Sequence, residues 1–141
     1  MEMTGSGQVN VQEIQDGANR VELYQCKNCN AASRFPRYGR VPTKLLETRK
    51  GRCGEWANCF TLILRAFGFL ARHVHDFADH VWCEFYSKAE HRWKHVDPCE
   101  GCVDKPKVYD HGWGKKLSYV IAVSIYEVQG VVQLLFPQSS L

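Results

Sequence analysis

The spacing of apolar residues predicts one long helix in the first half of the chain. Between residues 55 and 67, apolar side chains recur at steps of three and four residues, which places them on one helix face. They are Trp56, Phe60, Ile63 and Phe67. Gly68 predicts the end of the helix, because glycine readily takes the left-handed conformation that follows a last turn. The helix is therefore expected to have Cys53 at its N-terminal end, with Arg65 near the negative end of its dipole.

Alternating patterns predict strands on both sides of this helix. Residues 80–86 are rich in β-branched and aromatic side chains, and residues 91–97 return as a second strand after a polar turn at residues 87–90. Pro98 ends the second strand, because proline has no N–H for a ladder. Further strands are predicted at residues 21–24, 70–77 and 117–124, the last in the middle of the sheet.

The remaining segments predict less regular structure. Residues 1–19 are polar and predict a loose lead-in, and residues 31–42 predict an irregular connector. Thr43 is predicted to cap a short helix over residues 44–48, with Glu47 close to a capping-box position. The resulting organisation has three parts: a polar lead-in at 1–20, a core at 21–124, and an apolar C-terminal tail at 125–141.

Composition narrows the class of protein. A chain of 141 residues with 45% hydrophobic and 12% aromatic residues predicts one globular domain. The net charge of +3 is spread along the chain, which predicts no nucleic-acid partner. No segment approaches the ~20 apolar residues that a membrane helix needs. Seven cysteines without an N-terminal signal pattern predict a reducing compartment, the cytoplasm.

Cys53 is the first candidate for chemistry. At a helix N-terminus, unpaired backbone N–H groups and the helix dipole lower the pKa of a thiol, and the thiolate is the nucleophile. The basic residues 49–52 just before it act in the same direction. A buried structural cysteine is the alternative interpretation of the same position.

A histidine and an aspartate are predicted to face each other in the strand pair. If residues 87–90 form the loop, His80 lies opposite Asp97 on the same side of the sheet, with Cβ atoms ~5 Å apart. Trp82 and Glu84 share that side. If the helix packs its N-terminus against this side, Cys53 completes a Cys-His-Asp triad in which cysteine attacks, histidine moves protons and aspartate orients the histidine.

Two alternatives to the triad remain open at this point. The His80–Asp97 pair is also explained as a stabilising cross-strand pair, and a register slip of one residue would turn His80 to the other side of the sheet. The other five histidines have no comparable partner and are predicted to be surface or structural residues; they are His73, His75, His91, His95 and His111.

Paired cysteines offer a candidate metal site. Cys26 and Cys29 form a CxxC at a strand end, which is a frequent half-site for tetrahedral zinc. Cys99 and Cys102 form a second CxxC, so a four-cysteine site within the chain is an open alternative. Against that alternative, Cys99 lies only two residues beyond Asp97.

Several motifs resemble one enzyme family. The segments are GRCGEWANCF at 51–60, DHVW at 79–82 with Glu84, Asp97 followed by Cys99 and Glu100, RFPRY at 34–38, KLLETR at 44–49 and GWGKKLSYV at 112–120. Together they resemble the cytoplasmic peptide:N-glycanases of the transglutaminase-like superfamily over residues 24–124. The resemblance implies an α+β, papain-like fold, with a catalytic cysteine at a helix N-terminus packed on an antiparallel sheet that carries histidine and aspartate.

The resemblance also implies an activity and a set of site residues. These enzymes are peptide-N4-(N-acetyl-beta-glucosaminyl)asparagine amidases, which remove N-glycans from misfolded glycoproteins through a thioester and leave aspartate. Carried over by position, Cys53 is the nucleophile, His80 the general base and acid, and Asp97 the orienting carboxylate. Trp82 would help to form the oxyanion site. The residues expected in or supporting the cleft are Arg72, Glu84, Trp93 and Trp113.

The chain departs from the family pattern at both ends. In the family, an earlier CxxC completes a structural zinc site with the pair matched by Cys26 and Cys29, and this chain does not contain it. We therefore expect a core truncated on its N-terminal side, with zinc possible but incomplete. Beyond residue 124 the resemblance fades. Expected partners are denatured N-glycoproteins and, by resemblance, proteasome-shuttle and ER-associated degradation proteins.

Two other function classes remain as alternatives. Transglutaminase-like domains that have lost their triad serve as protein-interaction modules, so a truncated, inactive core acting in this way is the main alternative. A transglutaminase or cysteine protease would use the same acyl-thioester chemistry on another amide. The complete set Cys53, His80 and Asp97 favours an enzyme, and the motifs outside the triad favour the glycanase.

Overall fold

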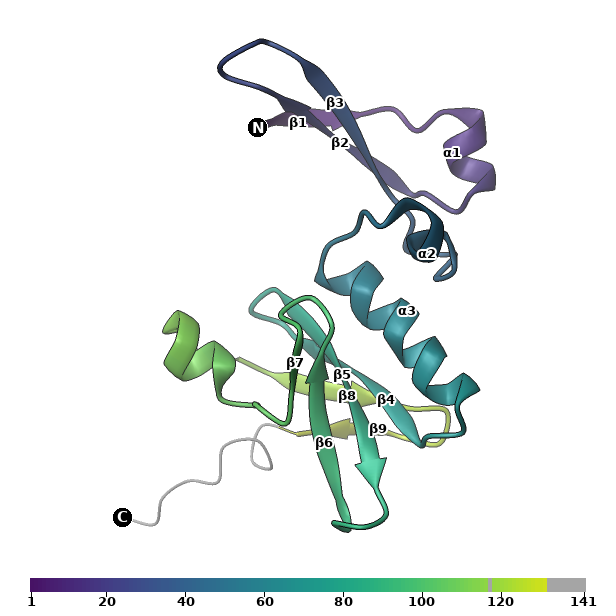
Figure 1. Cartoon of the computed structure of the whole chain (residues 1–141), viewed down its shortest axis with the longest axis vertical. Helices are drawn as coiled ribbons and strands as arrows, with labels where there is room; N and C mark the ends of the chain where they lie inside the picture. Colours follow the sequence, from purple (N-terminus) through teal and green to yellow (C-terminus); the bar gives the residue numbers. More distant parts are fainter. Residues whose placement is uncertain (117, 132–141) are drawn as a thin grey trace.

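The computed structural model describes residues 1–116 and 118–131, which form two antiparallel sheets and a few helices (Figure 1). The first sheet has the order β1-β2-β3 and the second the order β7-β6-β5-β4-β8-β9. In Figure 1 the sheets lie at opposite ends of the molecule, with α2 and α3 between them. The first sheet and its helix comprise β1 (Glu2–Gly7), α1 (Val11–Gln15), β2 (Arg20–Gln25) and β3 (Ala32–Arg37). The remaining elements are α2 (Lys44–Thr48), α3 (Cys53–Ala66), β4 (Ala71–Asp76), β5 (His80–Ser87), β6 (Arg92–Asp97), β7 (Cys102–Val103), the π-helical turn η1 (Val108–Gly112), β8 (Val120–Val123) and β9 (Val128–Gly130).

The first nineteen residues are ordered, so the expected loose lead-in is wrong. β1 pairs antiparallel with β2, and α1 begins at a capping box in which Asn10 and Glu13 exchange hydrogen bonds of 2.8 Å. β1 is an edge strand whose residues are mostly exposed, so it carries little apolar signal. Its pairing rests on main-chain hydrogen bonds, which polar residues form as well as apolar ones.

The expected irregular connector at residues 31–42 is also wrong in part. β3 pairs with β2 over six residues without a break. Pro36 lies within β3. A proline is tolerated there because β3 is an edge strand, where a missing N–H on the outer side removes no ladder bond.

The short helix α2 has the predicted bounds but not the predicted cap. Thr43 has helical dihedral angles (φ −66°, ψ −23°) and its side chain makes no capping hydrogen bond. The Lys44 N–H instead donates to the Val41 carbonyl over 3.0 Å. The preceding turn, rather than a side chain, therefore satisfies this N–H.

Helix α3 begins at Cys53 and is followed by Gly68 with φ +81°, both as predicted. Its buried face differs from the predicted one. The small residues Ala57 and Cys59 are buried with Leu64, whereas Phe67 is 80% exposed. Because small side chains let the helix lie close to the sheet, the bulky residues are displaced to its flank. There Trp56, Phe60 and Ile63 line an apolar cavity of ≈ 370 Å³ with residues of β6 and β7.

The hairpin of β5 and β6 forms, with a register two residues away from the predicted one. Cys83 faces Val96 and Ser87 faces Arg92, so the loop is residues 88–91, and the predicted facing of His80 with Asp97 is wrong. A shift of two residues leaves every side chain on its predicted side of the sheet. His80 and Asp97 therefore still lie on a common side, as diagonal neighbours.

The two sides of the second sheet have different cores. Helix α3 packs on the side that carries Val81, Cys83 and Phe85. The other side holds a buried cluster of Val74, Trp82, Tyr109, Val120, Ala122 and Val131. Because residues alternate along a strand, α3 covers the side opposite to His80, contrary to the expected packing. Cys53 approaches His80 around the end of β5 instead.

The C-terminal part adds elements that the sequence did not indicate. β8 lies inside the sheet as expected, between β4 and β9, although it begins at Val120 and residue 117 lies outside the described residues. β9 pairs with β8, so the predicted tail at 125–141 contains a strand, and its residues 132–141 lie outside the described part. No helix within the described residues is long and apolar enough to cross a membrane.

Candidate active site

Cys53 is the first residue of α3, and its surroundings favour a thiolate. The preceding residue Arg52 is extended, and its N–H donates to the Glu55 carboxylate over 2.9 Å, which secures the start of the helix. The neighbouring imidazole of His80 lowers the pKa of the Cys53 thiol, with help from the backbone N–H groups of Val81 and Gly54. Partial burial opposes this shift and is outweighed.

His80 is the first residue of β5 and lies buried between Asp97 and Cys53. Its Nε2–H donates to Asp97 Oδ2 over 2.7 Å. Burial opposes the charged imidazole, but the hydrogen bonds to Asp97 and Cys53 raise the pKa of His80 to about 9. Because Nε2 is engaged by Asp97, Nδ1 is the nitrogen left for proton exchange with Cys53.

Asp97, the last residue of β6, is fully buried, and each of its two carboxylate oxygens accepts two hydrogen bonds. Oδ2 accepts from His80 and from the Tyr109 hydroxyl, each over 2.7 Å. Oδ1 accepts the backbone N–H groups of Cys99 and Glu100, over 2.8 and 3.1 Å. Burial would raise the pKa of Asp97, yet these donors, His80 first, lower it. The group thus remains a carboxylate, and the structure brings Cys53, His80 and Asp97 together.

A cleft of ≈ 630 Å³ opens onto the thiol and the imidazole. It lies where the two sheets approach the start of α3, and most of its lining is polar or charged. The lining residues are Arg20, Glu22, Arg37, Gly51, Arg52, Cys53, Asp79, His80, Cys99, Glu100 and Trp113. Asp97 lies behind His80 and is not among them. The arrangement can hold a substrate against a nucleophile and a proton carrier.

Four charged residues, here called the arginine network, fasten the first sheet to the start of α3. Arg37 donates to both oxygens of Glu55, over 2.8 and 2.7 Å, and to Glu22 over 2.7 Å. Arg52 donates to the same Glu22 carboxylate over 2.6 Å. The hydrogen bond from Arg52 leads the contributions that lower the pKa of Glu22 to about 2. The network therefore sets where Cys53 lies relative to the first sheet.

Two predicted tryptophans lie on different sides of His80. Trp113 is 47% exposed, lines the cleft and meets the His80 ring edge-on, with ring centroids 5.0 Å apart. Trp82 is fully buried and stacks behind His80 with centroids 6.0 Å apart. Its indole N–H has no hydrogen-bond partner among the described residues and does not line the cleft. A role for Trp82 in oxyanion binding therefore stays a prediction.

The other predicted supporting residues form a cluster of their own, away from Cys53. Arg72 pairs with Glu84 over 2.6 Å and lies 4.0 Å from the centre of the Trp93 ring. Its Nη1 donates to Gln129 of β9 over 3.1 Å. The three residues line a separate cavity of ≈ 330 Å³ and do not line the Cys53 cleft. Their part in the site is at most indirect support for the sheet that carries His80, and this stays a prediction.

Tyr109 contacts Asp97, His95 contacts Tyr109, and neither residue was assigned to the site from the sequence. The Tyr109 hydroxyl bonds to Asp97 and lies 2.7 Å from His95 Nε2. The alternation of β6 places His95 on the same side as Asp97, which was a usable signal. Tyr109 lies in a π-helical turn twelve residues beyond Asp97, and no local pattern indicates its position.

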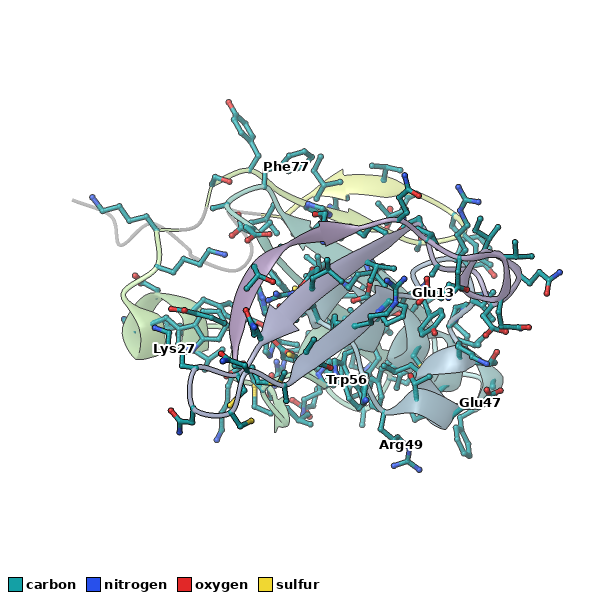
Figure 2. The ribbon with its side chains drawn as sticks, turned by 90° about the horizontal axis from the view of Figure 1, so that it is seen from above. Glu13, Lys27, Glu47, Arg49, Trp56 and Phe77 are labelled. Atoms are coloured by element: carbon teal, nitrogen blue, oxygen red, sulfur yellow. The ribbon has the colours of Figure 1, made fainter. Side chains whose placement is uncertain are left out.

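Cys26 and Cys29 lie in the turn between β2 and β3. Lys27 of the same turn projects from the periphery of the molecule (Figure 2). The backbone N–H groups of Cys29 and Asn28 point at the Cys26 sulfur and lower its pKa. This turn suits two ligands of a tetrahedral thiolate site. Within the described residues, no group of three or more potential ligands gathers at one point, so Cys99 and Cys102 do not complete the site.

Comparison with known proteins agrees with this architecture. The sequence model of the transglutaminase-like superfamily matches residues 3–98. Proteins named peptide-N(4)-(N-acetyl-beta-glucosaminyl)asparagine amidase are similar: that of rice (Oryza sativa subsp. japonica) is 59% identical over 120 residues, 85% of this chain and 27% of its own length. The Arabidopsis thaliana protein is 58% identical over 120 residues, 85% of this chain and 16% of its own. The human protein is 60% identical over 119 residues, 84% of this chain and 18% of its own.

The chain thus spans about a quarter or less of the length of these relatives. The superfamily match and the α3-on-sheet arrangement confirm the predicted α+β, papain-like fold class. The chain belongs to the transglutaminase-like superfamily.

Proposed function

We propose that this chain is the catalytic core of a peptide-N4-(N-acetyl-beta-glucosaminyl)asparagine amidase. The observation that carries the proposal is the Cys53–His80–Asp97 arrangement at the wall of an open cleft. The names of relatives 58–60% identical to the chain support the choice of amide. Thiol catalysis of amide cleavage needs a nucleophile, a proton carrier and a group that orients the carrier, and these three residues supply them.

The first half of the reaction forms a thioester. The Cys53 thiolate attacks the side-chain carbonyl carbon of a glycosylated asparagine, and the bond to the amide nitrogen breaks. The imidazolium of His80 gives its Nδ1 proton to that nitrogen, so the glycan leaves as a glycosylamine. Asp97 keeps the ring oriented and stabilises its charge through the 2.7 Å bond to Nε2.

The second half of the reaction restores the enzyme. The neutral His80 takes a proton from water, which attacks the thioester carbonyl. The bond to sulfur breaks, and the product is an aspartate side chain in place of asparagine. For the oxyanion of both steps we propose the N–H groups at the start of α3, because unpaired N–H groups and the dipole converge there.

The substrate class follows from the same proposal. A glycosylated asparagine reaches a sulfur at the wall of a cleft only where the surrounding polypeptide is extended, so denatured N-glycoproteins are the proposed substrates. Proteasome-shuttle and ER-associated degradation proteins are proposed as partners. A cytoplasmic location is consistent with seven cysteines that are all free.

Zinc belongs to the proposal as a structural ion. Cys26 and Cys29 would supply two thiolates, and the N–H groups directed at Cys26 favour its charged form. The test is zinc content measured by a chromogenic chelator in two double variants. Cys26→Ser with Cys29→Ser should lower bound zinc, and the matched pair Cys99→Ser with Cys102→Ser should not. Equal zinc in all three proteins would contradict the assignment.

The function is tested on denatured ribonuclease B, by gel shift and by mass detection of aspartate at the glycosylation site. Cys53→Ala should abolish conversion, whereas Cys99→Ala, in the same cleft, should retain most of it. Conversion by Cys53→Ala would refute the triad. A folded wild-type protein that converts nothing would instead favour an interaction module, and incorporation of an amine into a protein substrate would favour a transglutaminase.

A further inference from the structure

The starting point is the unequal support of the two oxygens of Asp97. Oδ1 is held by two backbone N–H groups of the turn that follows β6, over 2.8 and 3.1 Å. Oδ2 carries the bond to His80, and its only other partner among the described residues is the Tyr109 hydroxyl at 2.7 Å. Apart from His80, the oxygen that faces the imidazole is thus held directly by one phenol.

The direction of each hydrogen bond follows from the groups present. A phenol has one proton, and a carboxylate only accepts. Tyr109 therefore donates to Asp97, and its oxygen must accept from His95 Nε2, 2.7 Å away. Nε2 must then carry the proton of His95. Nδ1 of His95 is buried and has no partner within residues 1–116 and 118–131, as expected for the other nitrogen of a neutral ring.

Burial keeps this arrangement in one protonation state. Burial lowers the pKa of His95 to about 4, so the ring is neutral at physiological pH. Burial, followed by the bond to Asp97, raises the pKa of Tyr109, so the phenol keeps its proton. The order His95 to Tyr109 to Asp97 is therefore fixed over the pH range in which the triad works.

We infer that His95 and Tyr109 are positioning residues, which hold the Asp97 carboxylate at the angle that orients His80. The inference rests on the proposed function, because it assigns the two residues a role in the same reaction. Tyr109 also packs its ring against His80 and Trp113, with centroids 4.7 and 5.3 Å apart. Phenylalanine would keep that packing, so the hydroxyl can be tested separately from the ring.

Tyr109→Phe is the first test. Loss of the hydroxyl leaves Oδ2 with His80 as its one described partner, so the carboxylate attracts the imidazolium more strongly but is less well oriented. We expect kcat on denatured ribonuclease B to fall about tenfold, the effect of one charge-assisted hydrogen bond, with KM unchanged. The pKa of His80, followed by NMR of a ¹⁵N-labelled ring, should rise. A wild-type kcat with an unchanged His80 pKa would overturn the inference.

The other titratable groups around His80, Asp97, Tyr109 and His95 stay the same in this comparison. Besides the arginine network across the cleft, they are Cys53 of α3, Asp76 of β4, Cys99 and Glu100 of the β6–β7 turn, Cys102 of β7, and Asp104 beyond it. Because Tyr109→Phe changes none of them, a shift in the His80 pKa reports on the hydroxyl. Near-UV circular dichroism checks that the fold is retained.

His95 is tested with a matched pair of variants. Gln presents an N–H near the position of Nε2, whereas Leu presents none. We expect His95→Gln to keep kcat within about threefold of wild type, and His95→Leu to lose as much as Tyr109→Phe. Equal kcat in His95→Gln and His95→Leu would overturn the role of the His95 N–H.

The readouts separate this inference from the proposed function. The pH dependence of Cys53 alkylation by iodoacetamide, read by peptide mass, reports on the Cys53–His80 pair without any glycoprotein. A wild-type protein that releases no glycan, but whose Cys53 profile moves to lower pH in Tyr109→Phe, would refute the amidase and support the positioning role. An active amidase whose kcat and alkylation profile are unchanged by Tyr109→Phe would support the amidase and refute the positioning role.

Discussion

Replacing Arg37 by methionine should lower the stability of the protein strongly. The Arg37 side chain is buried, 7% exposed, and makes three hydrogen bonds of 2.7–2.8 Å to Glu22 and Glu55. Methionine replaces the aliphatic stem but has no donor, so Arg37→Met would leave two buried carboxylates short of a partner. Glu22 would retain Arg52, and Glu55 would retain one backbone N–H.

The magnitude follows from the burial of these groups. Removing one partner of a buried ion pair costs about 3–5 kcal/mol, and the contacts that remain favour the lower end, about 3 kcal/mol. The entropy of unfolding for a domain of this size is about 0.3 kcal/mol/K, so the midpoint of thermal unfolding should fall by about 10 °C. The start of α3 would loosen with it, because Glu55 also secures the Arg52 N–H there.

Differential scanning calorimetry of wild type, Arg37→Met and Arg92→Met measures the effect. Arg92 is the matched control, because it also pairs with two carboxylates, Glu90 and Asp104, but on an exposed part of the surface. Exposed pairs contribute about 0–1 kcal/mol, so Arg92→Met should change the midpoint by at most a few degrees. If Arg37→Met behaved like Arg92→Met, the assigned role of the arginine network would be wrong.

Three further outcomes are expected. The native state excludes a proton from His95 until the pH approaches about 4, whereas an unfolded histidine binds it near 6.5. The contribution of His95 to stability should therefore be full above pH 6.5 and fall toward pH 4 by up to about 3 kcal/mol. Urea unfolding at several pH values should therefore show a flatter dependence in His95→Gln, and an identical slope in both proteins would contradict this. At pH 6, iodoacetamide should modify Cys53 faster than Cys99 of the same cleft. The pKa of Cys53 is lowered, whereas burial and the charges of Asp97 and Cys53 raise the pKa of Cys99. Comparable modification rates, measured by peptide mass, would count against a thiolate at Cys53. Deletion of residues 1–7 removes β1 and should lower the thermal midpoint, whereas the same midpoint would show that β1 contributes no stability.

Patterns local in sequence predicted the parts of the site that depend on local structure. The three- and four-residue spacing, with Gly68 after it, placed Cys53 at a helix start. Backbone N–H groups are unpaired at such a start whatever the helix packs on, so the effect on the thiol could be predicted as well. The content of residues 80–86 and 91–97 predicted a hairpin, and period-two alternation put His80 and Asp97 on one side of the sheet. That prediction held under a register error of two residues, since an even shift preserves the side.

Tertiary structure decided which edge strands form and which face of α3 is buried, because both depend on partners distant in sequence. β1 and β3 have little apolar signal because they are edge strands, and main-chain pairing with β2 orders them. The buried face of α3 was decided by how closely Ala57 and Cys59 let it approach the sheet, and the bulkier Phe67 stayed exposed.

The sequence by itself determined the position of Cys53 at a helix start, the strand pair and the side of the sheet that carries histidine and aspartate, since each depends on spacing within one element or one hairpin. Only the tertiary structure brought Cys53 around the end of β5, Arg37 to Glu55, and Tyr109 to Asp97. Those contacts join residues 12 to 27 positions apart in different elements, and their geometry is set by packing that no local periodicity encodes.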